Sequence, residues 1–150
     1  MKTVQLGTIS VIHETWLPYA AACLISYCNK IPEIKSNYKF NEPLYKYKPV
    51  EEYTEMFKSI DVFGLTCYVW NQAYNDQMMS HYKDVNPNGI AMYGGPNVPE
   101  DPKLAEQFAK DHPYIDICWV GPGEKLISNF LQNIDAPMQT HDGGFGIGWN

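Results

Sequence analysis

Several features that define common functional classes are scarce or missing in this chain. Only 11 residues are Lys or Arg, they form no basic run, and the formal net charge is −6. Such a chain repels phosphate backbones, so we expect no nucleic-acid partner. No apolar run is long enough to cross a bilayer, and we expect no membrane association either.

An export signal is also lacking. The short apolar stretch after Lys2 ends at His13 and Glu14, and Ala20–Ala22, which imitates a cleavage site, fits better inside a helix. We therefore expect a cytoplasmic protein in a reducing compartment, with its cysteines as thiols. The four cysteines contain no Cys-x-x-Cys pair, so we expect no zinc or redox site; they are Cys23, Cys28, Cys67 and Cys118.

The common nucleotide-binding motifs are absent as well. No G-x-G-x-x-G follows the first predicted strand, and no G-x-x-x-x-G-K-[ST] occurs. A flavin mononucleotide site would need a hydroxyl-rich loop after that strand, and Thr8, Ser10 and Thr15 are too scattered to form one.

What the chain does contain is a regular alternation of strands and helices. Its 150 residues, 45% hydrophobic and 19% charged, suit one globular domain. Helical spacing of apolar residues predicts helices over 18–29, 50–60, 71–82, 101–112 and 126–131. Apolar runs predict strands over 3–10, 38–40, 62–65, 90–93 and 115–120, and the remainder of 31–49 reads as irregular.

Five strand–helix alternations predict an α/β fold of three layers with a parallel sheet. The natural strand order for five strands is 2-1-3-4-5, a Rossmann-like (flavodoxin-like) arrangement. We expect one domain over 1–134. The remaining residues, 135–150, are glycine-rich and read as a C-terminal tail.

The segment after the third strand has an unusual composition. The apolar run 62–65 leads into Thr66, Cys67, Tyr68, Trp70 and Asn71, a small polar cluster with two large aromatics. In an open parallel sheet, ligands bind at the carboxyl ends of the strands, where this turn lies. The alternative is that both aromatics simply close the core.

Two further strands end in glycines. Gly94-Gly95 follows one strand and Gly121-Pro122-Gly123 follows the next. Residues without side chains allow close approach of backbone to a ligand, although a tight turn with positive φ is the favoured explanation of each pair taken alone. Together, the three turns suit a large, flat, partly apolar ligand with a slim polar extension.

Four segments, taken in order, resemble a known family. They are Leu17–Ala21, Asp61–Asn71, Gly94–Pro96, and His112–Asp116 leading to Gly121–Glu124. The Tyr-Val-Trp-Asn string at 68–71 and the double glycine are fairly specific. The family is the N-terminal cobalamin-binding domain of cobalamin-dependent radical S-adenosylmethionine (SAM) enzymes.

The resemblance implies that cobalamin (vitamin B12) binds at the carboxyl ends of the strands, with its nucleotide tail beside the sheet and its corrin ring exposed. It implies a base-off, histidine-off state, with residues 66–70 facing the lower side of the corrin. The cofactor-binding residues implied are Leu17, Pro18, Tyr19, Leu65, Thr66, Cys67, Tyr68, Val69, Trp70, Asn71, Gly94, Gly95, Pro96, Gly121, Pro122, Gly123 and Glu124.

The chain departs from the family pattern in two places. Pro122 stands where the family usually has the first acid of Gly-Glu-Gly-Glu, so a contact to a following domain is in doubt. The spacing Cys-x-x-x-Cys-x-x-Cys, which holds the [4Fe–4S] cluster of a radical SAM domain, does not occur. This chain cannot run that chemistry alone.

Single residues give weaker signals. His13 lies near the position of the histidine in Asp-x-His-x-x-Gly of other cobalamin proteins, but Val11 and Trp16 replace the Asp and the Gly. We therefore favour a solvent-facing turn histidine over a cobalt ligand, and His81, His112 and His141 are less well placed. Cys67 as a nucleophile would need a histidine base nearby, and a packed residue is the favoured interpretation.

The sequence thus predicts a stand-alone cobalamin-binding module that carries cobalamin, presents it to a partner enzyme or senses it. One alternative is the front part of a cobalamin-dependent radical SAM enzyme, or a subunit that works with one in trans; a second copy of the chain is a further possible partner. The other alternative is a flavodoxin-like interaction module that binds flavin or no cofactor. No catalytic constellation was found, so enzymatic activity stays open.

Overall fold

The structure, a computed structural model, describes residues 1–12, 16–135 and 146–147. Its strands form one sheet in the order β2-β1-β3-β4-β5-β6. The first five are parallel and have the predicted order 2-1-3-4-5, and β6 pairs with β5 in the antiparallel direction. The strands are β1 (Lys2–Gly7), β2 (Tyr38–Phe40), β3 (Val62–Thr66), β4 (Ile90–Gly94), β5 (Ile117–Trp119) and β6 (Gly146–Ile147).

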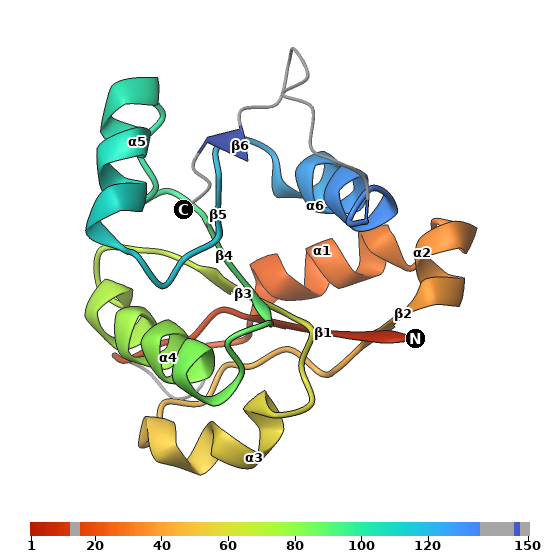
Figure 1. Cartoon of the computed structure of the whole chain (residues 1–150), viewed down its shortest axis with the longest axis horizontal. Coiled ribbons are helices and arrows are strands. Elements are labelled where there is room, and N and C mark those ends of the chain that lie inside the picture. Colours follow the sequence, from red (N-terminus) through yellow and green to blue (C-terminus); the bar gives the residue numbers. More distant parts are fainter. Residues whose placement is uncertain (13–15, 136–145, 148–150) are drawn as a thin grey trace.

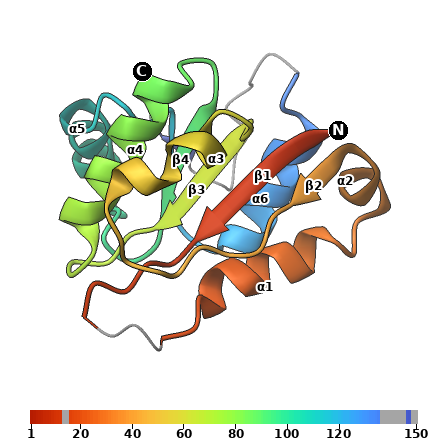
Figure 2. The ribbon, with the colours of Figure 1, turned by 90° about the horizontal axis from the view of Figure 1, so that it is seen from below.

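Helices cover both faces of the sheet, so the three-layer α/β prediction is confirmed (Figure 1). Figure 2 shows the long helix α1 running beneath the sheet, on the side away from α3 and α4. The helical elements are α1 (Tyr19–Cys28), α2 (Pro32–Asn37), the 3₁₀ turn η1 (Val50–Tyr53), α3 (Thr54–Phe57), α4 (Gln72–Val85), α5 (Pro102–Asp111) and α6 (Gly123–Gln132).

Each face of the sheet has its own core. On one face, α1, α2 and α6 pack over residues such as Val62 and Met92. On the other, α3, α4 and α5 pack over residues such as Phe63 and Tyr93. Because β3 is buried on both faces, its sequence is apolar without alternation, as the sequence analysis assumed.

The segment 31–49 is less irregular than its prolines suggest. Pro32 does not act as a break there: it occupies the first turn of α2, where its missing N–H costs no hydrogen bond. Ile34 on this helix is fully buried. The prediction of irregular structure before the edge strand β2 was therefore wrong.

Helix α5 begins where the sequence indicates and, with one exception, packs the expected residues inward. Asp101 caps it, accepting hydrogen bonds from the N–H groups of Lys103 and Leu104, each at 3.0 Å. Of the three residues that helical spacing places inward, Ala105 is buried and Phe108 packs against the core, but Leu104 is 60% exposed. The helix also buries Ala109, and the two alanines bring it close to the sheet.

The strand register brings the strand ends to one edge. Gly7 pairs with Leu65 and Thr66 with Gly94, so the carboxyl ends of β1, β3 and β4 lie side by side. The turns that follow them therefore share that edge. None of the helices in the described part of the chain has the length and apolar character needed to cross a membrane.

Candidate ligand-binding site

A cavity of about 330 Å³ lies at the carboxyl ends of the strands, between the sheet and helices α1 and α6. Every parallel strand except the edge strand β2 contributes to its wall. The lining residues are Leu6, Gly7, Tyr19, Ala20, Ala21, Cys23, Leu24, Gly64, Leu65, Thr66, Tyr68, Met92, Gly94, Gly95, Pro96, Trp119, Gly121, Gly123, Glu124 and Ile127.

Residues with little or no side chain keep this cavity open. A Cβ atom at Gly64, in the middle of β3, would lie 2.8 Å from Leu6 Cδ2 and 3.0 Å from Met92 Cε. On the helical wall, Ala20 and Ala21 of α1 expose only methyl groups. A slot with glycine on the sheet side and alanine on the helix side accepts a flat group between the two.

The two glycines of the β4 turn have different roles. Gly94 has no left-handed φ, and a Cβ there would meet the Cβ of Trp119 at an ordinary 3.6 Å across the cavity wall. Gly95 has a φ of +103°, and its Cβ would lie 2.9 Å from the main-chain oxygen of Cys67. Gly94 therefore borders the ligand space, whereas Gly95 is required by the turn itself.

The rim of the cavity is aromatic. The rings of Tyr68 and Trp70 stack with centroids 4.3 Å apart and planes 14° from parallel. Trp16, from the β1–α1 connection, meets Trp70 edge-on at 6.3 Å. Leu17, Tyr19 and Val69 are each more than three-quarters exposed. Of these residues, Tyr19 and Tyr68 line the cavity, and the others are their neighbours in sequence or in ring contact.

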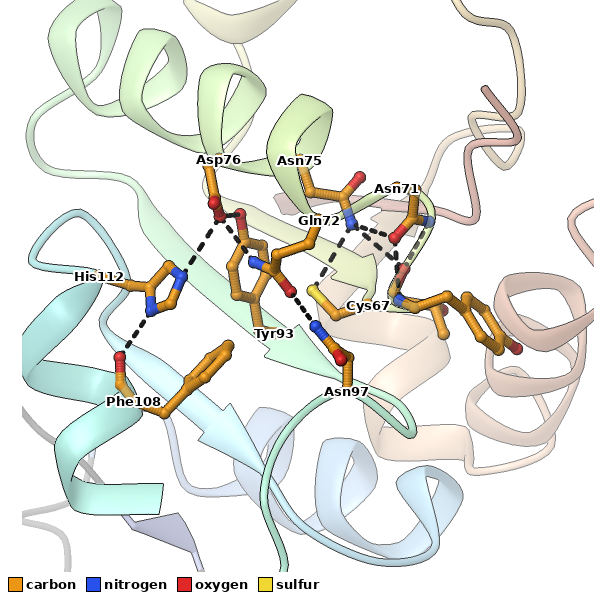
Figure 3. A network of polar contacts seen from close by, with 11 residues as sticks. Cys67, Asn71, Gln72, Asn75, Asp76, Tyr93, Asn97, Phe108 and His112 are labelled. Carbon is orange, nitrogen blue, oxygen red and sulfur yellow. Dashed lines mark hydrogen bonds and ion pairs between the residues drawn. The ribbon is translucent and has the colours of Figure 1, made fainter. Parts of the chain in front are cut away.

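The turn that carries Tyr68 and Trp70 is held from below by Asn71, which is fully buried (Figure 3). Its Nδ2 donates to the main-chain oxygens of Ile9, at 3.0 Å, and Thr66, at 3.1 Å. Its Oδ1 accepts from the N–H of Tyr68 at 2.9 Å and from Nδ2 of Asn75 at 3.2 Å. The Asn71 side chain thus connects the turn to the segment after β1, to the end of β3 and to α4.

Cys67 lies beneath this turn and does not face the cavity. It is fully buried, and Nδ2 of Asn75 donates to its Sγ at 3.5 Å. Burial raises the pKa of the Cys67 thiol far above its usual range, so the thiolate is not available at neutral pH. The interpretation of Cys67 as a packed residue rather than a nucleophile is supported.

A second set of polar contacts lies on the α4 side of the sheet, the side away from the cavity (Figure 3). Asp76 Oδ1 accepts from the hydroxyl of Tyr93 at 3.0 Å and from Nε2 of Gln72 at 2.7 Å, and it lies 3.6 Å from Nε2 of His112. Gln72 Oε1 in turn accepts from Nδ2 of Asn97 at 2.9 Å. These contacts brace the β4 turn against α4, on the far side from the cavity.

The described histidines lie away from the cavity. His112 contacts the main-chain oxygen of Phe108 through Nδ1 at 2.6 Å, and His81 contacts the hydroxyl of Thr54 at 2.8 Å. Both belong to the α3, α4 and α5 face. The remaining two, His13 and His141, lie outside the described residues, as does Asp142.

The residues predicted for the site fall into three groups. Those that line the cavity are Tyr19, Leu65, Thr66, Tyr68, Gly94, Gly95, Pro96, Gly121, Gly123 and Glu124. Exposed positions outside its wall are Leu17, Val69, Trp70 and Pro122. Buried positions that support the turns are Pro18, Cys67 and Asn71.

Sequence reasoning missed lining residues that lie inside regular elements. Gly64 interrupts an apolar strand, and an isolated strand glycine is a known sign of close approach. Leu24, Met92 and Ile127 resemble ordinary core residues. Trp119 ends β5 on the same face as Ile117, and alternation along the strand places its ring toward the cavity side.

Comparison with known proteins gives the class of this site. No protein-family model matches the chain. The chain is 35% identical to the cobalamin-dependent radical SAM methyltransferase TokK of Streptomyces tokunonensis. The matched region covers 77% of this chain and 17% of that relative. It is also 33% identical to 2-(S-pantetheinyl)-carbapenam-3-carboxylate methyltransferase of Streptantibioticus cattleyicolor, over 88% of this chain and 19% of that relative.

These comparisons confirm the resemblance seen in the sequence. Over most of its length, this Rossmann-like chain is similar to part of two methyltransferases, one of which is a cobalamin-dependent radical SAM enzyme. It spans about a fifth of the length of the curated relatives it matches.

The residues present fit the nucleotide arm of a corrinoid. The cavity volume lies at the lower end of the roughly 300–1,000 Å³ typical of ligand pockets, which suits an arm but not a whole corrin ring. Glycine and alanine leave a flat slot, and the indole Nε1 of Trp119 is buried without an acceptor among the described residues. The corrin ring itself would have to lie outside, over the rim.

Proposed function

We propose that this chain binds cobalamin in the base-off, histidine-off state, with the nucleotide arm in the cavity and the corrin ring over the turn 66–70. The observation that carries the proposal is the slot itself. It opens at the carboxyl ends of a parallel sheet, beneath a stacked Tyr68–Trp70 pair, in a chain similar to a cobalamin-dependent enzyme.

The apolar rim supports this placement of the corrin. Val69, next to the lining residue Tyr68, and Leu17, two residues before the lining residue Tyr19, are 79% and 81% exposed. A corrin ring is flat and largely apolar on its faces, so it would cover such side chains. The Tyr68–Trp70 stack offers a rigid platform beside them.

The histidine-off state is supported by the positions of His81 and His112. Both contact other residues on the face opposite the cavity. Cobalt above the turn 66–70 would face side chains of that turn, none of which is a histidine. Such a cofactor is held by its arm and ring, not by a protein–cobalt bond.

For the role of the bound cobalamin, we propose carriage, presentation to a partner enzyme, or sensing, in the cytoplasm. A second candidate has a specific observation in its favour. Because the chain spans only 17–19% of its relatives, it resembles one portion of a much larger enzyme. A radical SAM domain, in the same polypeptide or in trans, would then supply the chemistry.

A retention experiment tests cobalamin binding. Purified protein is mixed with hydroxocobalamin and desalted, and the absorption spectrum of the protein fraction is recorded. We expect the protein to retain about one corrinoid per chain with a base-off spectrum. Colour that passes entirely into the salt fraction contradicts the proposal, and a base-on spectrum contradicts the base-off part of it.

Two variants of α1 form a matched pair for this experiment. Ala20→Leu adds three carbons at a residue that lines the slot, and Ala22→Leu adds the same carbons at an exposed position of the same helix. We expect Ala20→Leu to lower retention by at least about tenfold, because it fills the space needed by the arm. Ala22→Leu should retain cobalamin like the unmodified chain.

A further inference from the structure

Trp119, a residue of the cavity wall, carries a polar group that has no partner among the described residues. Trp119 ends β5, and its ring packs edge-on against Phe130 of α6, with centroids 5.6 Å apart. Its indole Nε1 is closed off from solvent and has no hydrogen-bond partner in the described part of the chain. An indole nitrogen is a donor only, so this N–H needs an acceptor.

An unpaired buried donor is uncommon and unfavourable. Most buried side-chain polar atoms in proteins have a partner, and a donor left without one destabilises the folded chain. The aliphatic lining residues Leu24 and Ile127 offer no acceptor, and no other described residue accepts from Nε1. The N–H is therefore available to a ligand that brings an acceptor of its own.

Asn75 Oδ1, a second buried atom without a partner among the described residues, provides a contrast. It belongs to the amide cluster beneath the turn 66–70, on the α4 side of the sheet, and Asn75 does not line the cavity. Trp119 does line the cavity. Of these two residues, only Trp119 belongs to the cavity wall, so its buried N–H can meet a bound arm once the ring turns toward the cavity.

Base-off cobalamin carries a matching acceptor. When the lower base leaves cobalt, the ring nitrogen of its benzimidazole loses its partner and becomes a free hydrogen-bond acceptor on a flat, apolar group. Inside an apolar slot, an unpaired donor and an unpaired acceptor each gain more from pairing than they would in water. The donor of the slot and the acceptor of the arm thus complement each other.

We infer that Nε1–H of Trp119 donates a hydrogen bond to the ring nitrogen of the lower base, which makes Trp119 a specificity residue for corrinoids with a nitrogenous base. This inference rests on the proposed cobalamin function. The side chain that Gly94 lacks would lie 3.8 Å from Cδ1 of the indole, next to Nε1. Its absence leaves room for the ring to turn when the arm enters.

The test compares two corrinoids on two proteins. One corrinoid is hydroxocobalamin. The other is a cobamide whose lower base is p-cresol, which is flat and apolar but has no ring nitrogen. The proteins are the unmodified chain and Trp119→Phe, which keeps an aromatic ring and removes the N–H. Cobalamin must first release its base from cobalt, but that cost is the same for both proteins and cancels in the double comparison.

We expect Trp119→Phe to weaken cobalamin binding by about three- to tenfold, the size of one neutral hydrogen bond, and to leave p-cresolyl cobamide binding unchanged. An equal loss for both corrinoids overturns the inference, because it indicates packing alone, and so does no loss for either. If the unmodified chain binds neither corrinoid, the proposed function itself fails.

A measurement on the unmodified chain covers the case in which Trp119→Phe does not fold. The indole N–H resonance of Trp119 is followed by NMR in ¹⁵N-labelled protein during titration. Donation to the base nitrogen should shift the proton downfield with cobalamin and not with the p-cresolyl cobamide. The same shift with both ligands, or with neither, overturns the inference.

Discussion

Among single residues, Asn71 has the largest structural role at this site. It follows the Tyr-Val-Trp string and was predicted as a site residue. It does occupy the cap position of α4, but its side chain does not cap the helix. It turns back to hold the turn 66–70 instead, through four hydrogen bonds.

Asn71→Asp tests this role with almost no change in shape. The carboxylate cannot donate to Ile9 and Thr66, and it places an unpaired charge where exposure is zero. We expect a loss of about 3 kcal/mol in the free energy of unfolding, measured by urea titration. Asn129→Asp, on the exposed face of α6, is the control and should change it by less than about 0.5 kcal/mol.

At the scale of single residues, the sequence predicted where the site lies but not the role of each residue in it. The Tyr-Val-Trp-Asn string and the double glycine identified the correct turns, because their residue types are unusual at strand ends. Trp119 was missed because nothing in the sequence marks an unpaired N–H. That property exists only once Phe130 and the strand direction have fixed the ring.

At the scale of elements, the turn after β4 contains two glycines, of which Gly94 can accept a side chain and Gly95 cannot. A methyl group at Gly95 would clash with Cγ2 of Thr66 at 2.8 Å, and the φ of +103° is strained for any L-residue. We expect Gly95→Ala to lower the free energy of unfolding by about 2–4 kcal/mol. Gly94→Ala meets only ordinary contacts and should change it by less than about 1 kcal/mol.

Urea titration of both variants decides the matter. Equal stability of Gly95→Ala and Gly94→Ala would mean that the turn rearranges freely and that no positive φ is needed. This pair also separates the two explanations that the sequence left open, a tight turn with positive φ and close approach to a ligand. Only Gly94 borders the cavity without being required by its own backbone.

Element prediction failed where a proline was treated as a break. The alternation of strands and helices was sufficient for the sheet order, because each crossover obeys the same handedness. The segment 31–49 gave no such periodic signal, and α2 has only six residues. Its helix is stabilised by burial of Ile34 and by its place beside α6, which a local pattern does not reveal.

At the scale of the whole molecule, two cores share one thin sheet, and cysteines are buried in both. Cys28 lies in the core under α1, and Cys67 and Cys118 lie in the other; all three are fully buried free thiols. Cys23 is only half-buried and lines the cavity. The core thiols therefore report on global stability, and Cys23 reports on the site.

The buried thiols make stability depend on pH in the alkaline range. Burial raises the pKa of Cys28 from 9.0 to about 11 and that of Cys118 from 9.0 to about 12. Above pH 9 the unfolded chain loses protons that the folded chain retains, so ionisation favours the unfolded state. We expect the urea midpoint to be constant up to about pH 8.5 and to fall steadily between pH 9 and 11.

The measurement is a series of urea titrations between pH 7.5 and 11 with reductant present. Cys28→Ala is the informative variant: it removes one of the titrating groups, so its midpoint should start lower and fall less steeply with pH. Tyr38, whose pKa burial raises from 10.0 to about 12, adds to the decline only above pH 10. A midpoint that stays constant to pH 11 would mean that the thiols ionise as easily in the folded chain as in the unfolded one, and that the two cores are open to water.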